Sequence, residues 1–206
     1  MLHPVPTLKE TASQTAGPYV HIGLTPNFSG IAGVYPTDPG VAMLTPDTVG
    51  ERITISGRIL DGSGAAVGDA VVELWQCDAD GSFAAPVRPN SNSVPSFLGW
   101  GRQPTSPEGV FRFDTIKPGR VPGPDGQLMA PHVSLWIVAR GINIGLQTRL
   151  YFEDEAEANA TDFVLNKIAD PRRRATLIAR RQEGEVPHYG LDIHLQGELE
   201  TVFFDI

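Results

Sequence analysis

Hydrophobic and polar residues alternate along several short stretches of this chain, and alternation at every second position is the pattern of a strand with one buried face. Such stretches occupy residues 53–60, 70–78, 110–113, 129–141, 142–152 and 189–199. Asp, Gly and Ser at 61–64 separate the first two stretches and suit a tight turn. We therefore predict an all-β fold in which 53–60 and 70–78 form a hairpin.

The stretch 129–141 has two different faces. One face is apolar, because every second residue from 133 to 139 is Val, Leu, Ile or Ala. The opposite face begins with His132 and ends with Arg140, polar groups that a core strand does not need unless something outside the core uses them. From the residues alone, the simpler interpretations are that His132 follows a turn at Pro131 and that Arg140 ends the strand in solvent.

Residues 1–50 contain many Pro and Gly residues and show no regular hydrophobic pattern, so we predict a long irregular N-terminal arm. An arm of this kind cannot form its own core and has to lie across another surface. Near its centre a polar and aromatic corner is a candidate for lining a pocket, and it consists of Thr15, Gly17, Pro18 and Tyr19. A turn with a packed tyrosine explains the same residues equally well.

Short helices are predicted after residue 152, where the hydrophobic period changes. Residues 163–168 suit one short helix. Asp170 followed by Pro171 predicts the N-cap and first residue of a second helix running through 172–181. We interpret its basic residues as a solvated helix face rather than an anion site; they are Arg172, Arg173, Arg174, Arg180 and Arg181. With no internal repeat and no linker, 51–206 is predicted to be one β-sandwich with short helices.

Composition narrows the class of protein. The 206 residues are 41% hydrophobic, and 22 Gly and 18 Pro suit short strands joined by many turns. A net charge of −8 argues against a nucleic-acid partner, because phosphate binding needs clustered Lys and Arg. The single cysteine, Cys77, cannot form an internal disulfide, and the N-terminus lacks a signal peptide's apolar run, so we expect a cytoplasmic protein. No apolar run approaches the length of a membrane span.

The residues alone indicate no complete catalytic or metal site. The five histidines are scattered, without the close pairs that usually mark a metal site. No phosphate-binding loop, dinucleotide-binding loop or nucleophile elbow is present. Cys77 lies within an apolar strand, and such surroundings disfavour the thiolate that a nucleophile needs.

Five motifs in order resemble the intradiol ring-cleaving dioxygenases, and the resemblance extends from about residue 51 to 197. The motifs are VVELWQCDADGSF, GWGR, EGVFRFDTIKPG, APHVSLWIVARG and TRLYFEDE. The resemblance implies a β-sandwich with short helices, as the alternation also predicts. A second reading remains open, because the segment 53–75 also resembles the opening hairpin of stand-alone transthyretin-like binding modules.

The resemblance implies a non-haem ferric ion that is held by two tyrosines and two histidines in the active members of the family. The matching positions in this chain are Phe83, Val121, His132 and Ser134. Only His132 keeps its ligand type, and one imidazole does not hold a ferric ion against water. The resemblance therefore implies an iron-free subunit rather than a single-chain dioxygenase with substitute ligands.

The resemblance also implies a partner and a reaction. The partner is a homologous iron-bearing beta chain in a large hetero-oligomer, which cleaves protocatechuate (3,4-dihydroxybenzoate) with O2 to 3-carboxy-cis,cis-muconate. The arm residues Thr15, Gly17, Pro18 and Tyr19, together with Arg140, are expected to border the substrate. A planar cation such as Arg140 suits the carboxylate of a benzoate. Arg149 is expected to form interface salt bridges instead.

Overall fold

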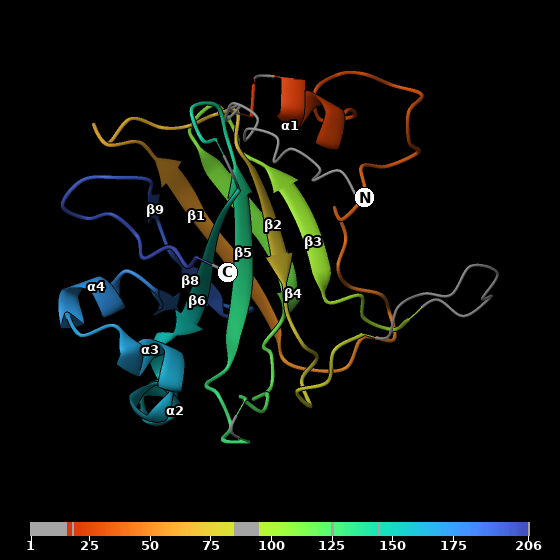
Figure 1. Ribbon diagram of the computed structural model, residues 1–206. Helices are drawn as coiled ribbons and strands as arrows, with labels where there is room; N and C mark the ends of the chain where they lie inside the picture. The colour runs from red at the N-terminus through yellow and green to blue at the C-terminus, as the bar shows by residue number, and fades with distance from the viewer. Residues whose placement is uncertain (1–15, 18, 85–94, 125, 144, 206) are drawn as a thin grey trace, which may run out of the picture.

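The computed structural model describes residues 16–17, 19–84, 95–124, 126–143 and 145–205 (Figure 1). The strands in these ranges are β1 (Arg52–Leu60), β2 (Val71–Trp75), β3 (Trp100–Pro104), β4 (Val110–Ile116), β5 (His132–Val138), β6 (Leu146–Phe152), β7 (Ile178–Gln182), β8 (His188–Gly190) and β9 (Ile193–His194). The helices are α1 (Tyr19–Leu24), η1 (Glu153–Glu155), α2 (Ala156–Thr161), α3 (Phe163–Lys167) and α4 (Pro171–Ala175). The predicted all-β fold is confirmed.

The strands form one hydrogen-bonded path that folds over into two layers. Its order is β3-β2-β5-β6-β7-β8-β1-β4, and β9 pairs with β1. In Figure 1, β2, β3, β5 and β6 lie in front of β1 and β4. Strand β7 joins the layers, because it pairs in parallel with β6 and antiparallel with β8. Side chains from both layers meet in one core, which is the arrangement of a β-sandwich.

The two faces predicted for 129–141 are confirmed in β5. Val133, Leu135 and Ile137 are buried in the core, while the residues between them are only partly buried. The chain therefore turns one side of β5 to the sandwich interior and the other to its outer surface. Arg140 follows the end of the strand.

The predicted hairpin of 53–60 with 70–78 is wrong. Strand β1 pairs with β4, β8 and β9, whereas β2 pairs with β3 and β5 in the other layer. The Asp61 carboxylate accepts hydrogen bonds from the backbone of Ser63 and Ala65, so the turn is local and the chain then crosses between layers. Thr105 fixes the crossing, because its hydroxyl accepts from Ala70 N and donates to Val67 O.

The predicted second helix is correct at its start and wrong in its length. Asp170 accepts a hydrogen bond from Arg172 N at 2.8 Å, and Pro171 occupies the first turn, as predicted. The helix ends at Ala175, and β7 follows because the buried Ala179 joins the core between β6 and β8. Arg180 and Arg181 therefore lie on a strand, so the predicted basic helix face is divided between two elements. The short helix predicted for 163–168 is confirmed as α3.

The described part of the N-terminal arm contains the unpredicted helix α1 and is attached to the free edge of β3. Arg102 of β3 donates to Leu24 O at 3.4 Å, and its own backbone N–H donates to Gly40 O. Gly40 allows this approach, since a Cβ there would lie 2.6 Å from Arg102 N. Farther along, Met43 enters the core. Figure 1 shows α1 beyond the upper ends of β2 and β3.

A second, smaller core lies on the outer face of β6, under the C-terminal helices. Tyr151 and Leu165 are buried there. Asp162 is fully buried between them, and its carboxylate accepts from Val164 N, Leu165 N and Ala130 N at 2.9–3.0 Å and from the Tyr151 hydroxyl at 3.3 Å. One side chain thus caps α3 and holds the entry of β5. Among the described residues, no helix has the length and apolar character needed to span a membrane.

Asp162→Ala is expected to lower the free energy of unfolding by about 2–4 kcal/mol, because it removes a cap and leaves buried donors without acceptors. Asp170→Ala, which removes the exposed cap of α4, is the matched control and should cost about 0.5–1 kcal/mol. Urea denaturation followed by circular dichroism measures both. Equal losses for the two variants would contradict the role given to Asp162.

Candidate functional site

The predicted site residues lie at two opposite ends of β5. His132 begins the strand and Arg140 follows its end, so eight residue steps of about 3.3 Å put them roughly 26 Å apart. The positions of the absent ligands cluster near the first end, and the described arm residues lie near the second. The chain therefore does not bring all of its candidate residues into one pocket.

Arg140 is held by a carboxylate at the second end. Its Nη2 lies 2.7 Å from Asp69 Oδ2, while 68% of the arginine side chain stays exposed. The antiparallel register explains the pair, because Val71 lies opposite Val138 and the same register continues to Asp69 and Arg140. Both residues line a cavity of about 530 Å³. The guanidinium is thus fixed on one side and open to solvent on the other.

The N-terminal arm approaches the same end of β5 as Arg140. Ala16 N donates a 3.0 Å hydrogen bond to Ile142 O, which places Gly17 beside the loop that carries Arg140. Tyr19 is 80% exposed at the start of α1, so the alternative of a turn with a packed tyrosine is wrong. Thr15 and Pro18 lie outside the described residues. The structure therefore brings Gly17 near the Arg140 loop and leaves Tyr19 pointing into solvent.

The four positions matching the family's iron ligands are contributed by the ends of three strands. Phe83 follows β2 and is 68% exposed, Val121 follows β4 and is buried, and β5 supplies the other two. The connection after β2 contacts the one between β4 and β5, because Gly119 N donates to Asp78 O at 2.8 Å, and Met129 N donates to Val121 O within the second connection. Ser134 lies opposite Arg149 in the β5–β6 register. The framework that would converge on a metal is present.

The side chains on this framework do not fit a ferric ion. Phe83 and Val121 have no donor atoms. The His132 Nδ1 lies 2.8 Å from Ala130 O and donates to it, and the ring packs at a tilt of 33° against the Tyr151 ring. Burial, and next the nearby Arg149 charge, lower the pKa of His132 to about 4, so the ring is neutral at pH 7. Within the described ranges, no three His, Cys, Asp or Glu side chains are grouped as metal ligands would be.

Arg149 donates from its Nη1 to the Tyr151 hydroxyl at 3.3 Å and lies 3.7 Å from Met129 Sδ. The interface salt bridges expected for this residue stay a prediction. A fixed cation here opposes the binding of a metal cation.

Asp69 was missed altogether, because its position opposite Arg140 follows from the β2–β5 pairing and the expected hairpin gave β2 another partner. The buried Cys77 has its pKa raised to about 11 by burial, which disfavours a nucleophile.

Comparison with known proteins gives relatives of two kinds, alpha chains and a beta chain. The family model described as Dioxygenase matches residues 25–197. Two relatives named protocatechuate 3,4-dioxygenase alpha chain align over nearly their whole length: that of Pseudomonas putida is 46% identical (98% of this chain, 99% of the relative), and that of Burkholderia cepacia is 40% identical (97% and 99%). The protocatechuate 3,4-dioxygenase beta chain of Burkholderia cepacia is 34% identical over 78% of this chain and 71% of its own length.

Solved structures agree with the sequence relatives. The dioxygenase domain of a dioxygenase carbohydrate-binding protein fusion from Streptomyces sp. SirexAA-E matches with a TM-score of 0.59 and 25% identity, covering 81% of this chain and 95% of that one. The strand order, the motif order and these relatives all point to one family. This chain belongs to the intradiol ring-cleaving dioxygenases.

Proposed function

We propose that this chain is the iron-free alpha subunit of a protocatechuate 3,4-dioxygenase. The observation that carries the proposal is the combination of an intact strand framework with Phe83 and Val121 at ligand positions and a cation, Arg149, beside the remaining histidine. The 46% identity to an alpha chain over nearly the full length supports it. The partner is a homologous beta chain that holds Fe(III), and the two chains assemble into a large hetero-oligomer.

In this complex the reaction converts protocatechuate and O2 to 3-carboxy-cis,cis-muconate. The ferric ion of the partner supplies the chemistry that activates the catechol for reaction with O2. Arg140 of this chain attracts and orients the substrate carboxylate, and Asp69 holds the guanidinium so that little side-chain entropy is lost on binding. The arm around Gly17 and Tyr19, with Thr15 and Pro18, limits access of water to the substrate. The described geometry of Arg140, open on one side, suits this role.

We propose that the arm, residues 1–50, packs on the partner chain while 51–206 form the sandwich. Large apolar side chains are exposed on the described part of the arm, which is unusual for a solvent-facing surface. They are Tyr19, Phe28, Ile31, Val34, Tyr35 and Val41. Aromatic and aliphatic groups of this kind are the usual centre of a subunit interface.

We place the protein in the cytoplasm, where the free Cys77 would stay reduced. The stand-alone transthyretin-like binding module is not proposed further. Its supporting feature was the hairpin signal in 53–75, and the two strands concerned do not pair with each other.

Arg140→Ala is expected to raise the KM for protocatechuate by a factor corresponding to about 1–3 kcal/mol, because a charged hydrogen bond to the carboxylate is lost. The KM for catechol, which has no carboxylate, should change much less. Steady-state oxygen uptake by the two-chain complex measures both. Arg112→Ala, an exposed arginine of β4 paired with Asp114, is the control. An equal rise for the two substrates would refute the pairing.

Val34→Asp is expected to weaken assembly with the beta chain by at least about tenfold in Kd, because burial of an unpaired charge at an interface costs several kcal/mol. Val186→Asp is the matched control, since the two valines are 55% and 45% exposed and the second lies outside the arm. Sedimentation of the mixed chains reports the Kd. Assembly equally affected in both variants would argue against the arm as interface.

A further inference from the structure

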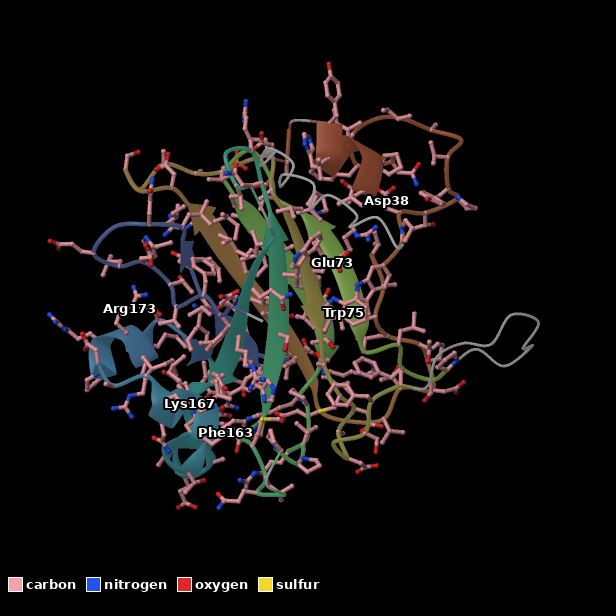
Figure 2. The ribbon with its side chains drawn as sticks, in the orientation of Figure 1. Asp38, Glu73, Trp75, Phe163, Lys167 and Arg173 are labelled. Carbon is pink, nitrogen blue, oxygen red and sulfur yellow. The ribbon has the colours of Figure 1, made fainter. Side chains whose placement is uncertain are left out.

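A cavity of about 410 Å³ lies on the outer face of β5 and β6, closed by α3 and by residues 202–205. This volume is within the usual range of small-molecule sites, about 300–1,000 Å³. Ser134 and Arg149 form its floor, and Lys167 projects from the end of α3. Figure 2 shows Phe163 and Lys167 close together beside this part of the sheet.

Two positively charged side chains line this cavity, and neither forms an ion pair with a described residue. Arg149 is half-buried, and its guanidinium contacts the Tyr151 hydroxyl and Met129 Sδ. Lys167 Nζ lies 5.2 Å from the centre of the Phe163 ring. In the parts of the chain that the structure describes, neither cation comes within 4.0 Å of a carboxylate, whereas most arginines of the sheets do.

A partly buried cation without a counter-ion costs free energy that a bound anion would recover. The nearest acid to Arg149 along its hydrogen bonds is Asp162, which is reached only through the Tyr151 hydroxyl and already accepts three backbone N–H groups. Asp205 also lines the cavity but is exposed at its edge, and it offsets one of the two cations. The cavity therefore keeps a net positive charge at its inner end.

Much of the remaining wall is apolar, although Gln147 and Thr148 also line it; the apolar side chains are Val164, Ile168, Val202 and Phe204. A hydrated inorganic anion gains little from such a wall, whereas a flat hydrocarbon body attached to a carboxylate would bury its surface there. The combination of charged floor and apolar wall therefore selects the chemical class of the ligand.

We propose that this cavity binds a small aromatic carboxylate of the benzoate class. The carboxylate lies between Arg149 and Lys167, with the Ser134 hydroxyl within the same pocket, and the ring packs against Ile168 and Phe204. Ser134 and Arg140 are six residue steps apart, roughly 20 Å, so this site does not depend on the role proposed for Arg140.

Calorimetric titration of the full chain with benzoate at low ionic strength tests the proposal. The unsubstituted chain is expected to bind one benzoate with a Kd on the order of 1 mM or tighter. Benzamide, the neutral analogue, should bind at least about tenfold more weakly. Arg149→Gln should weaken benzoate binding at least about tenfold, and Lys167→Gln should weaken it several-fold.

Arg172→Gln provides the same change of charge on an exposed helix position and should leave binding unchanged. If Arg149→Gln lowers stability, Arg149→Lys keeps the charge and should retain most of the affinity. Where the chain is studied in complex with its partner, the signal is the difference between the unsubstituted and the Arg149→Gln complexes, because benzoate binding at the partner's site is common to both. Failure here is then separate from failure of the proposed function. Absence of saturable binding, or equal binding by Arg149→Gln and the unsubstituted chain, would overturn the proposal.

Discussion

The antiparallel pairing of β2 with β5 is the constraint on which both ends of this molecule depend. Its register sets Val71 opposite Val138 and Trp75 opposite Ser134. At one end the register brings Asp69 to Arg140, and the resulting ion pair holds an exposed guanidinium in place. At the other end it aligns the loops that carry Phe83 and His132. A shift of one residue in this register would turn every side chain of β5 to the opposite face. It would break the Asp69–Arg140 ion pair and misalign the loops that carry Phe83 and His132.

Electrostatics then separates this chain from the iron-binding members of its family. A ferric site needs anionic donors around a cation, whereas here an arginine lies opposite Ser134 and helps to depress the pKa of His132 to about 4. The Tyr151 hydroxyl joins that arginine to the buried Asp162. The strands whose positions match the family's expected iron ligands thus support a polar network in this chain. This chain has the strand framework of its family, and it has a positive charge, Arg149, beside the positions where a ferric ion would need anionic donors.

Local patterns predicted local structure well. Alternation gave the correct faces of β5, and the Asp-Pro pair at 170–171 gave the correct start of α4, because both depend on residues near in sequence. Strand pairing was not predictable in the same way, since alternation says which face is buried but not which strand is the neighbour. The hairpin error followed, and with it the failure to find Asp69. Strand β7 was missed because its position is fixed by β6 and β8 rather than by its own five residues.

The iron content of the separated chains is the most direct test of the central claim, that this polypeptide shapes a reaction chamber whose metal is held elsewhere. The two chains are expressed apart, loaded with ferrous iron under identical conditions, oxidised and measured by atomic emission and by the visible absorption of iron-bound tyrosinate. The beta chain should hold about one iron and this chain almost none. About one iron per chain on this polypeptide alone, lost on substitution of His132, would contradict the account.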